Sequence, residues 1–182
     1  TIHAFCRSKL LKKELISYAD YLNLCAENSG FKAQRTTPSE FNNSKHKFFK
    51  FLNDAFGQGK TIKEHWNSLR ENSSIYHPYN NFRMITEMKE VYDNYKKVNQ
   101  MCDYDDMIAD FINNAVDPDI DVLIVDEAQD SNVPQLQALK KMSTNVKEYY
   151  MVGDADQTIF EFSGAKADYF HKLSKDAQQL EQ

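Results

Sequence analysis

Cysteine is scarce in this chain: Cys6, Cys25 and Cys102 are the only three in 182 residues, and they lie far apart. An odd number of widely spaced cysteines does not make a disulfide framework, so we expect reduced thiols in a cytosolic protein. His3 and Cys6 have a loose metal-like spacing, but no second pair accompanies them. A buried histidine and cysteine are therefore a better interpretation than a zinc site.

Long apolar runs are absent as well. No stretch approaches the ~20 residues of a membrane span, and residues 1–15 lack the apolar region and cleavage site of a secretory signal peptide. We expect a cytoplasmic protein with no membrane partner. Hydrophobic residues make up 41% and charged residues 27% of the chain, which is typical of a globular protein with a sizeable core.

The charge is unevenly distributed. The net charge of −5 argues weakly against a nucleic-acid partner, but residues 1–71 hold 12 Lys/Arg against 7 Asp/Glu, and residues 72–182 hold 10 against 20. The first part is thus basic and the second acidic. A basic surface can attract a phosphate backbone, although a solvated helix face explains the charge equally well.

Apolar periodicity predicts helices over most of the first 115 residues. One apolar stripe runs from Leu11 through Leu15 to Cys25 and predicts a helix that ends at Ser29-Gly30. Pairs of the form Thr-x-x-Glu at residues 37–40 and 61–64 predict two further helix starts. Later stripes predict helices from residue 82 and from residue 104, the second capped by Asp103. We expect residues 12–95 to form a helical subdomain with a core around Phe41, Phe48, Leu52 and Trp66.

The pattern changes near residue 120. The segments DVLIVDEAQD (121–130), with its apolar start VLIV, and EYYMVGD (148–154) predict two strands buried on both faces, and Pro134 opens a short helix between them. A strand, a helix and a second strand form a βαβ unit with a parallel pair. The fold class is therefore α/β.

Acidic side chains follow both predicted strands. Asp126 and Glu127 come directly after the first, and Asp154 follows the second. Because the carboxyl ends of parallel strands meet at one edge, these acids should lie together. Nucleotide hydrolases use such a pair to hold magnesium and to activate water. Helix capping by acids in a turn is the simpler alternative, but it does not explain why both turns lie at one edge.

A hydrolase of this kind also needs a glycine-rich phosphate loop. The candidate GQGKT (57–61) has Asp54 where the first glycine should stand, and an amphipathic helix precedes it instead of a buried strand. We interpret Gly57 as the end of one helix and Thr61 as the start of the next. The acid pair therefore has no partner loop in these residues.

Four segments, in this order and spacing, resemble the UvrD/Rep group of superfamily 1 DNA helicases: TIHAFC (1–6), DYDDMI (103–108), VDEAQD (125–130) and VGDADQTIFEFSGA (152–165). The last two are long and specific, and the resemblance covers nearly the whole chain. It implies an internal fragment of an ATP-dependent motor that moves on single-stranded DNA, 3′ to 5′ by family analogy, in a bacterium or a phage. Residues 1–11 and 96–182 would form part of the first RecA-like motor domain, 1A. Residues 12–95 would form its 1B insertion.

The resemblance also implies roles for single residues. Asp126 would hold Mg²⁺, Glu127 would be the general base, and Gln157 would sense the γ-phosphate of ATP. Thr1 and His3 would touch the DNA backbone. Phe160 and Phe162 would stack on bases. The motif DYDDMI is given no chemistry, since Asp103 and Asp106 suit a first helical turn.

The sequence departs from the family at two of these positions. Ser163 stands where the family commonly has arginine, and Phe162 replaces the usual tryptophan. At residue 163 the chain therefore lacks the charged DNA contact that an arginine would make.

Two other functions compete with the motor. One is a nonenzymatic helical module that binds DNA or a partner protein. The other is a two-metal nuclease built on Asp126, Glu127, Asp154 and Asp156, which lacks the His or Lys partners that we would expect.

Overall fold

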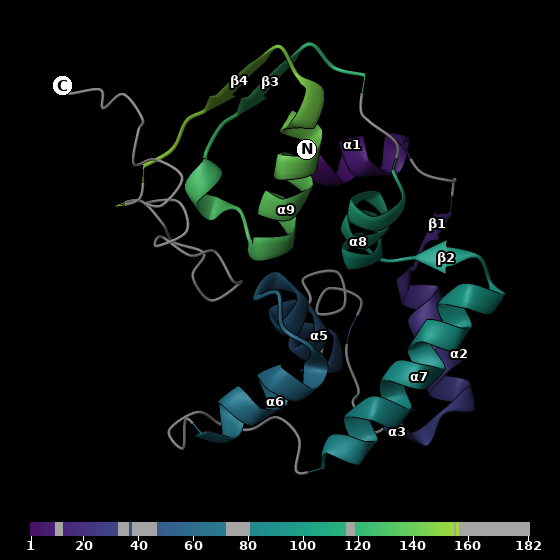
Figure 1. The fold of residues 1–182 in the computed structure, drawn as a ribbon. Coiled ribbons are helices and arrows are strands. Elements are labelled where there is room, and N and C mark those ends of the chain that lie inside the picture. Colours follow the sequence, from purple (N-terminus) through teal and green to yellow (C-terminus); the bar gives the residue numbers. More distant parts are fainter. Residues whose placement is uncertain are drawn as a thin grey trace.

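The computed structural model describes residues 1–9, 13–32, 37, 47–71, 81–115, 119–154 and 156 (Figure 1). Within these ranges the elements follow in the order α1 (Ile2–Ser8), β1 (Glu14–Leu15), α2 (Tyr18–Glu27), α3 (Ser29–Lys32), α5 (Lys47–Gly57), α6 (Ile62–Glu71), α7 (Phe82–Val98), β2 (Met101–Cys102), α8 (Tyr104–Asn114), β3 (Val122–Val125), η1 (Ala128–Asp130), α9 (Val133–Met142), η2 (Ser143–Asn145) and β4 (Glu148–Met151).

The strands form two small parallel sheets. β3 pairs with β4 in the register Val122 to Glu148 and Val125 to Met151. Helix α9 connects the two strands, so the predicted βαβ unit and its parallel pair are confirmed. Helices with parallel strands are compatible with the α/β class expected from the sequence.

The second sheet, β1 with β2, was not predicted. Leu15 lies in a strand that pairs with Cys102, and the neighbouring Ile16 N–H donates to the Cys102 carbonyl at 3.0 Å. The helix expected from Leu11 to Cys25 is therefore wrong in its first part: α2 begins only after Ser17. The run does end close to the predicted stop: α2 ends at Glu27 and Asn28 is extended, but a separate short helix, α3, starts at Ser29.

Capping boxes determine where several helices begin. The Thr61 hydroxyl accepts the Glu64 N–H at 3.2 Å, while the Glu64 carboxylate accepts the Thr61 N–H at 2.8 Å. Asp103 and Asp106 form the same reciprocal pair at the start of α8. Both predictions are confirmed, whereas the box expected at residues 37–40 falls largely outside the described residues.

The segment 57–61 is a helix end followed by a helix start, as the sequence suggested. Gly59 has φ +64°, and its N–H donates to Phe56 O at 2.8 Å while Lys60 N–H donates to Ala55 O at 2.9 Å. This pair of bonds is the Schellman arrangement that closes an α-helix with a left-handed residue. Helix α5 ends at Gly57, as predicted, and Gly59 supplies the left-handed conformation of the turn that follows it.

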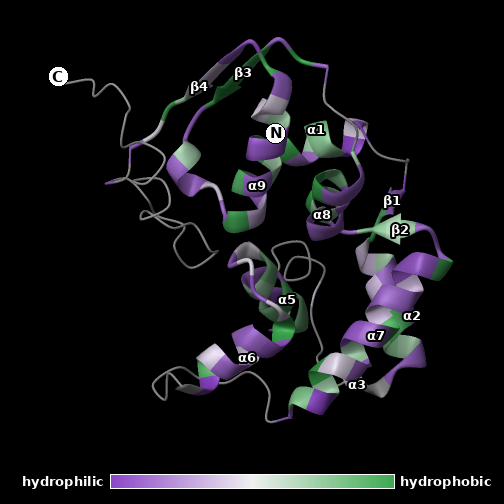
Figure 2. Ribbon diagram, in the orientation of Figure 1, coloured by the Kyte–Doolittle hydropathy of each residue, from purple (hydrophilic) through white to green (hydrophobic). Residues whose placement is uncertain are grey.

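Most helices alternate hydrophobic and hydrophilic residues along the ribbon (Figure 2). Among the described residues, the buried side chains gather in two separate clusters. One joins α1, α8, β3 and α9 around Phe111, Ile108 and Leu139. The other joins α2, α3, α5, α6 and α7, and its members are Tyr21, Leu24, Phe31, Phe48, Phe49, Phe51, Trp66, Ile85, Met88 and Tyr92. The second cluster lies wholly within residues 12–95.

One face of the β3–β4 sheet is exposed. Leu123 and Val125 pack into the core beside α9, but the alternate residues Val122 and Ile124 are 48% and 67% exposed. Tyr150, the register partner of Ile124, is 52% exposed. The expectation of strands buried on both faces is therefore wrong here, because α9 covers one face and no described element covers the other.

In the part of the chain that the structure describes, every helix is too short or too polar to cross a membrane.

Candidate functional site

The two acidic turns meet at one edge of the β3–β4 sheet. Asp126 follows the last residue of β3, and Asp154 follows β4 after two residues. Backbone hydrogen bonds continue beyond the strands: Val152 N–H donates to Val125 O at 2.8 Å, and Ala128 N–H donates to Val152 O at 3.0 Å. The structure thus brings Asp126, Glu127 and Asp154 to the same edge, as predicted.

Glu127 occupies a backbone conformation that side-chain-bearing residues rarely adopt. Its φ is 51° and its ψ is 44°, in the left-handed region. This conformation costs roughly 1–2 kcal/mol for a residue with a Cβ atom. The turn is held by Asp126, whose Oδ1 accepts the Glu127 N–H at 3.0 Å, and by η1, which starts directly afterwards. Strain of this kind is commonly found at functional sites.

A buried glutamine joins the two turns. Gln129 is 2% exposed; its Nε2 donates to Glu127 Oε2 at 2.7 Å, and its Oε1 accepts the Asp154 N–H at 3.0 Å. Sequence reasoning missed this residue. The available signal was a neutral amide two positions after Glu127 in an otherwise acidic turn.

Asp126 presents an exposed carboxylate beside a cavity of about 420 Å³. Thr1, Ser131 and Gln135 supply the other polar groups of the lining, and apolar side chains of α1, β3 and α9 complete it. One exposed carboxylate suits a magnesium ion that takes most of its ligands from water and substrate phosphates. The residues present therefore fit such an ion through Asp126.

A metal site made from protein ligands alone finds no support. Across the described ranges, no group of three or more His, Cys, Asp or Glu side chains is arranged to hold a metal ion. The two-metal nuclease needs such a cluster at Asp126, Glu127, Asp154 and Asp156. The arrangement at this edge therefore favours the other interpretations.

The first predicted DNA-contacting residues lie on α1. Thr1 caps this helix, and its hydroxyl accepts the Ala4 N–H at 3.4 Å. His3 packs edge-on against Tyr104 of α8, with ring centroids 5.3 Å apart. Burial lowers the pKa of His3 from its ordinary value, which favours the neutral ring. A neutral half-buried ring can offer a hydrogen bond to a phosphate but not a charge.

The other predicted contacts lie outside the described residues. Gln157, Phe160 and Phe162 all belong to this group. Their roles stay predictions.

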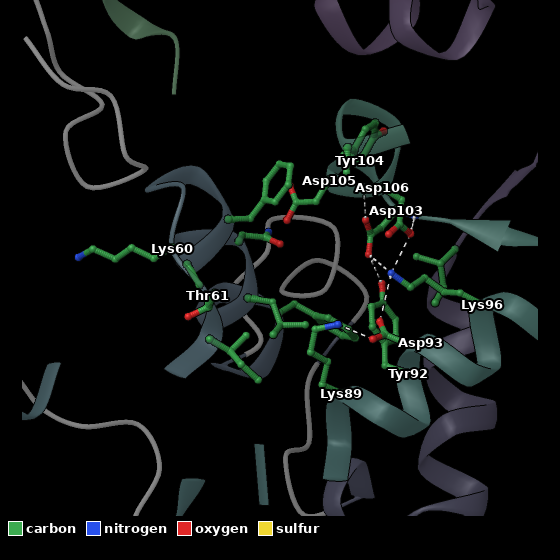
Figure 3. A pocket seen from close by; sticks show the side chains of 18 of the residues that line it. Lys60, Thr61, Lys89, Tyr92, Asp93, Lys96, Asp103, Tyr104, Asp105 and Asp106 are labelled. Atoms are coloured by element: carbon green, nitrogen blue, oxygen red, sulfur yellow. Dashed lines mark hydrogen bonds and ion pairs between the residues drawn. The ribbon is translucent and has the colours of Figure 1, made fainter. Parts of the chain in front are cut away.

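A second cavity, of about 730 Å³, lies between α5, α7 and α8 (Figure 3). On one side Lys96 reaches Asp103 and Asp106, each at 2.7 Å, and Tyr92 donates to Asp103 at 3.0 Å. The other side belongs to α5 and the turn before α6, where Lys60 points away from these carboxylates. This cluster lies apart from the acidic turns after β3 and β4.

The charged side chains around this cavity shift one another's pKa values. Burial lowers the pKa of Lys96, but the carboxylates of Asp103 and Asp106 more than offset this, so the net shift is upward. Burial raises the pKa of Asp103, but the Lys96 ammonium and the hydrogen bonds from Lys96, the Asp106 N–H and Tyr92 together outweigh it, so the net shift is downward. For Asp105 the balance is reversed: burial, followed by Asp103 and Asp106, outweighs the opposing effect of Lys96 and raises its pKa to about 8. The motif DYDDMI thus ties α8 to α7, which fits the structural role given to it.

Comparison with known proteins places these observations in a family. The sequence profile of the UvrD/REP helicase N-terminal domain matches residues 1–178. The chain is 40% identical over 55 residues to a probable DNA helicase II homolog of Mycoplasma capricolum subsp. capricolum. The aligned residues make up 30% of this chain and 8% of that protein. It is 32% identical over 87 residues to the ATP-dependent DNA helicase Rep of Buchnera aphidicola subsp. Schizaphis graminum. This alignment covers 43% of this chain and 13% of the Rep protein. The aligned part is thus a small fraction of each relative.

Proposed function

The chain belongs to the UvrD/Rep helicase family, and we propose that it is part of a DNA helicase in which ATP hydrolysis drives movement along single-stranded DNA. The observation that carries this proposal is the meeting of Asp126, Glu127 and Asp154 at the carboxyl edge of the parallel pair β3–β4. Open parallel sheets bind their ligands at this edge. Movement from 3′ to 5′ is proposed with it, by analogy with the family.

Asp126 and Glu127 have distinct roles in this proposal. Glu127 is the general base, since its carboxylate is held at the edge by Gln129 and can accept a proton from an attacking water. Asp126 holds Mg²⁺, and the ion neutralises charge on the phosphates of ATP when it is bound. Gln157 contacts the γ-phosphate.

The glycine loop for the phosphates is absent from the 182 residues, so these residues alone are not expected to hydrolyse ATP.

The DNA contacts are proposed for both ends of the chain. Thr1 and His3 lie near the DNA backbone, and Phe160 and Phe162 stack on bases. Ring stacking is sequence-tolerant because every base has a π-face, which suits a motor that moves over any sequence.

The domain assignment is part of the same proposal. Residues 1–11 and 96–182 belong to the motor domain 1A, and residues 12–95 form the 1B insertion. The two separate hydrophobic clusters support this division, since one lies entirely within residues 12–95.

The substitution Glu127→Gln in the full-length natural protein tests the proposed function. It preserves the size of the side chain and removes the base, so ATP hydrolysis in the presence of single-stranded DNA should fall by ~10²–10⁴-fold. Binding of a fluorescent ATP analogue should stay within about threefold of wild type, because a base acts on water rather than on the nucleotide.

The matched control is Glu148→Gln. Glu148 lies on β4 in the same sheet, is exposed and accepts a hydrogen bond from Tyr150, but it is at the opposite end of the strand from the acidic turns. This variant should hydrolyse ATP normally. If Glu127→Gln also keeps its activity, the assignment of the base is wrong.

A further inference from the structure

Gln129 is the side chain that physically connects the two acidic turns. It belongs to η1, directly after Glu127 and Ala128, and it is almost completely buried. Its amide is used at both ends: the nitrogen donates to the Glu127 carboxylate, and the oxygen accepts the backbone N–H of Asp154. An amide is the neutral side chain that can donate and accept simultaneously in this way.

The bond from Gln129 restricts one oxygen of Glu127. The donor contacts Oε2 at 2.7 Å, which is short for an N–H to oxygen bond and typical of a charged acceptor. Among the described residues, none donates to the second oxygen, Oε1. The carboxylate is thus held by one oxygen, and the other is left to accept a proton.

The bond to Asp154 attaches this carboxylate to the far turn. Asp154 itself holds its own loop, because its Oδ1 accepts the Asp156 N–H at 3.0 Å. A displacement of the segment after β4 would therefore move the Gln129 amide, and with it the Glu127 carboxylate. A buried amide cannot exchange these partners for water without cost.

We propose that Gln129 is a positioning residue that sets the orientation of Glu127 according to the position of the Asp154 turn. This inference rests on the proposed function, since it assumes that Glu127 acts as the base. It adds a mechanical link between hydrolysis and the loop that follows β4. Misplacement of a reacting group by about 1 Å can reduce a rate by ~100-fold.

The test uses the full-length natural protein and two variants of one position. Gln129→Leu removes both hydrogen bonds and keeps a buried side chain of similar size. Its kcat for ATP hydrolysis with saturating single-stranded DNA should fall by ~10- to 100-fold, while the KM for ATP should stay within about threefold because the phosphate contacts are untouched.

Gln129→Glu separates a positioning role from a structural one. The introduced carboxyl still accepts from the Asp154 N–H, but it donates to Glu127 only when it is protonated. Its kcat should be low at pH 8 and should recover relative to that of Gln129→Leu as the pH falls towards 6. A purely structural role for Gln129 predicts pH profiles of the same shape for both variants.

The control is Asn28→Leu, in the connection between α2 and α3. Asn28 also accepts a backbone N–H through its side-chain oxygen, from Gly30 at 3.0 Å, but it does not contact either acidic turn. This variant should lower the melting temperature and leave kcat within about threefold of wild type. A kcat of Gln129→Leu within threefold of wild type, or an equal loss of kcat in Asn28→Leu, would overturn the proposal.

Failure of the proposed function gives a different result. If the wild-type protein does not hydrolyse ATP, or if Glu127→Gln remains active, Glu127 is not the base. The bridge itself is then still measurable by amide hydrogen exchange at Asp154. Exchange there should be faster in Gln129→Leu than in the wild type or in Asn28→Leu, and an unchanged rate would show that the bridge does not hold the turn.

Discussion

Gly59 lies in the turn between α5 and α6, where it touches the first residue of α9. Its φ of +64° belongs to the left-handed region, and a Cβ atom added there would lie 2.8 Å from Val133 Cγ1. Val133 begins the helix that follows the acidic turn after β3. The substitution Gly59→Ala therefore tests how tightly the α5–α6 turn is fitted against the segment beside the candidate site.

Two costs add in Gly59→Ala. The left-handed conformation costs a residue with a Cβ atom roughly 1–2 kcal/mol. The contact of 2.8 Å is far shorter than the ~3.5–4.0 Å at which carbon atoms attract, and overpacking of this kind costs about 1–3 kcal/mol. We expect the free energy of unfolding to fall by roughly 2–5 kcal/mol, the sum of these two costs.

Urea unfolding provides the measurement. Trp66 is the single tryptophan, is 7% exposed and packs against Phe82, so its fluorescence reports the cluster that includes α5 and α6. Far-UV circular dichroism follows the helices as a whole. Coincident transitions would show that the two clusters unfold together.

Two further variants separate the costs. Val133→Ala removes the clashing methyl group, so the double variant should recover the overpacking part and keep the backbone part, a coupling of about 1–3 kcal/mol. Gly30→Ala is the control: its Cβ would lie 3.0 Å from the flexible Met88 side chain, and its φ is not in the left-handed region. It should change stability by less than about 1 kcal/mol. If Gly59→Ala is as stable as wild type, the tight fit of this turn is refuted.

Three more outcomes are expected. Lys96→Met should destabilise the chain by about 3 kcal/mol in urea unfolding, because it leaves Asp103 and Asp106 without the buried cation that they contact. A loss below 1 kcal/mol would contradict this. The raised pKa of Asp105, about 8, means that wild-type stability is lost as the pH rises from about 4 to 8. The stability of Asp105→Asn relative to wild type should therefore increase over that range, whereas a constant difference would show that the carboxyl titrates normally. In the full-length protein, Phe160→Ala and Phe162→Ala should each weaken single-stranded DNA binding by ~1–3 kcal/mol with little change in salt dependence; a drop in melting temperature at unchanged affinity would mean that the rings are core.

The sequence by itself determined the structural elements that depend on contacts between residues close together along the chain. Thr61 with Glu64, and Asp103 with Asp106, cap helices through contacts three positions apart, so the sequence alone locates the two helix starts. The same reasoning showed that GQGKT is a helix junction. The parallel pair β3–β4 was also predictable, since strand, helix and strand follow directly along the chain.

Tertiary structure decided the features that depend on distant partners. Leu15 reads as part of a helical stripe, but its pairing with Cys102 makes it a strand residue. Ile124 has a pattern typical of a buried strand, yet its exposure depends on what covers that face of the sheet. Gln129 looks like one more polar residue in a turn, and only the approach of Asp154, 25 positions away, reveals its two hydrogen bonds. Periodicity and capping record the preferences of neighbouring residues, whereas pairing, exposure and the bridge between the turns arise when segments far apart along the chain come together.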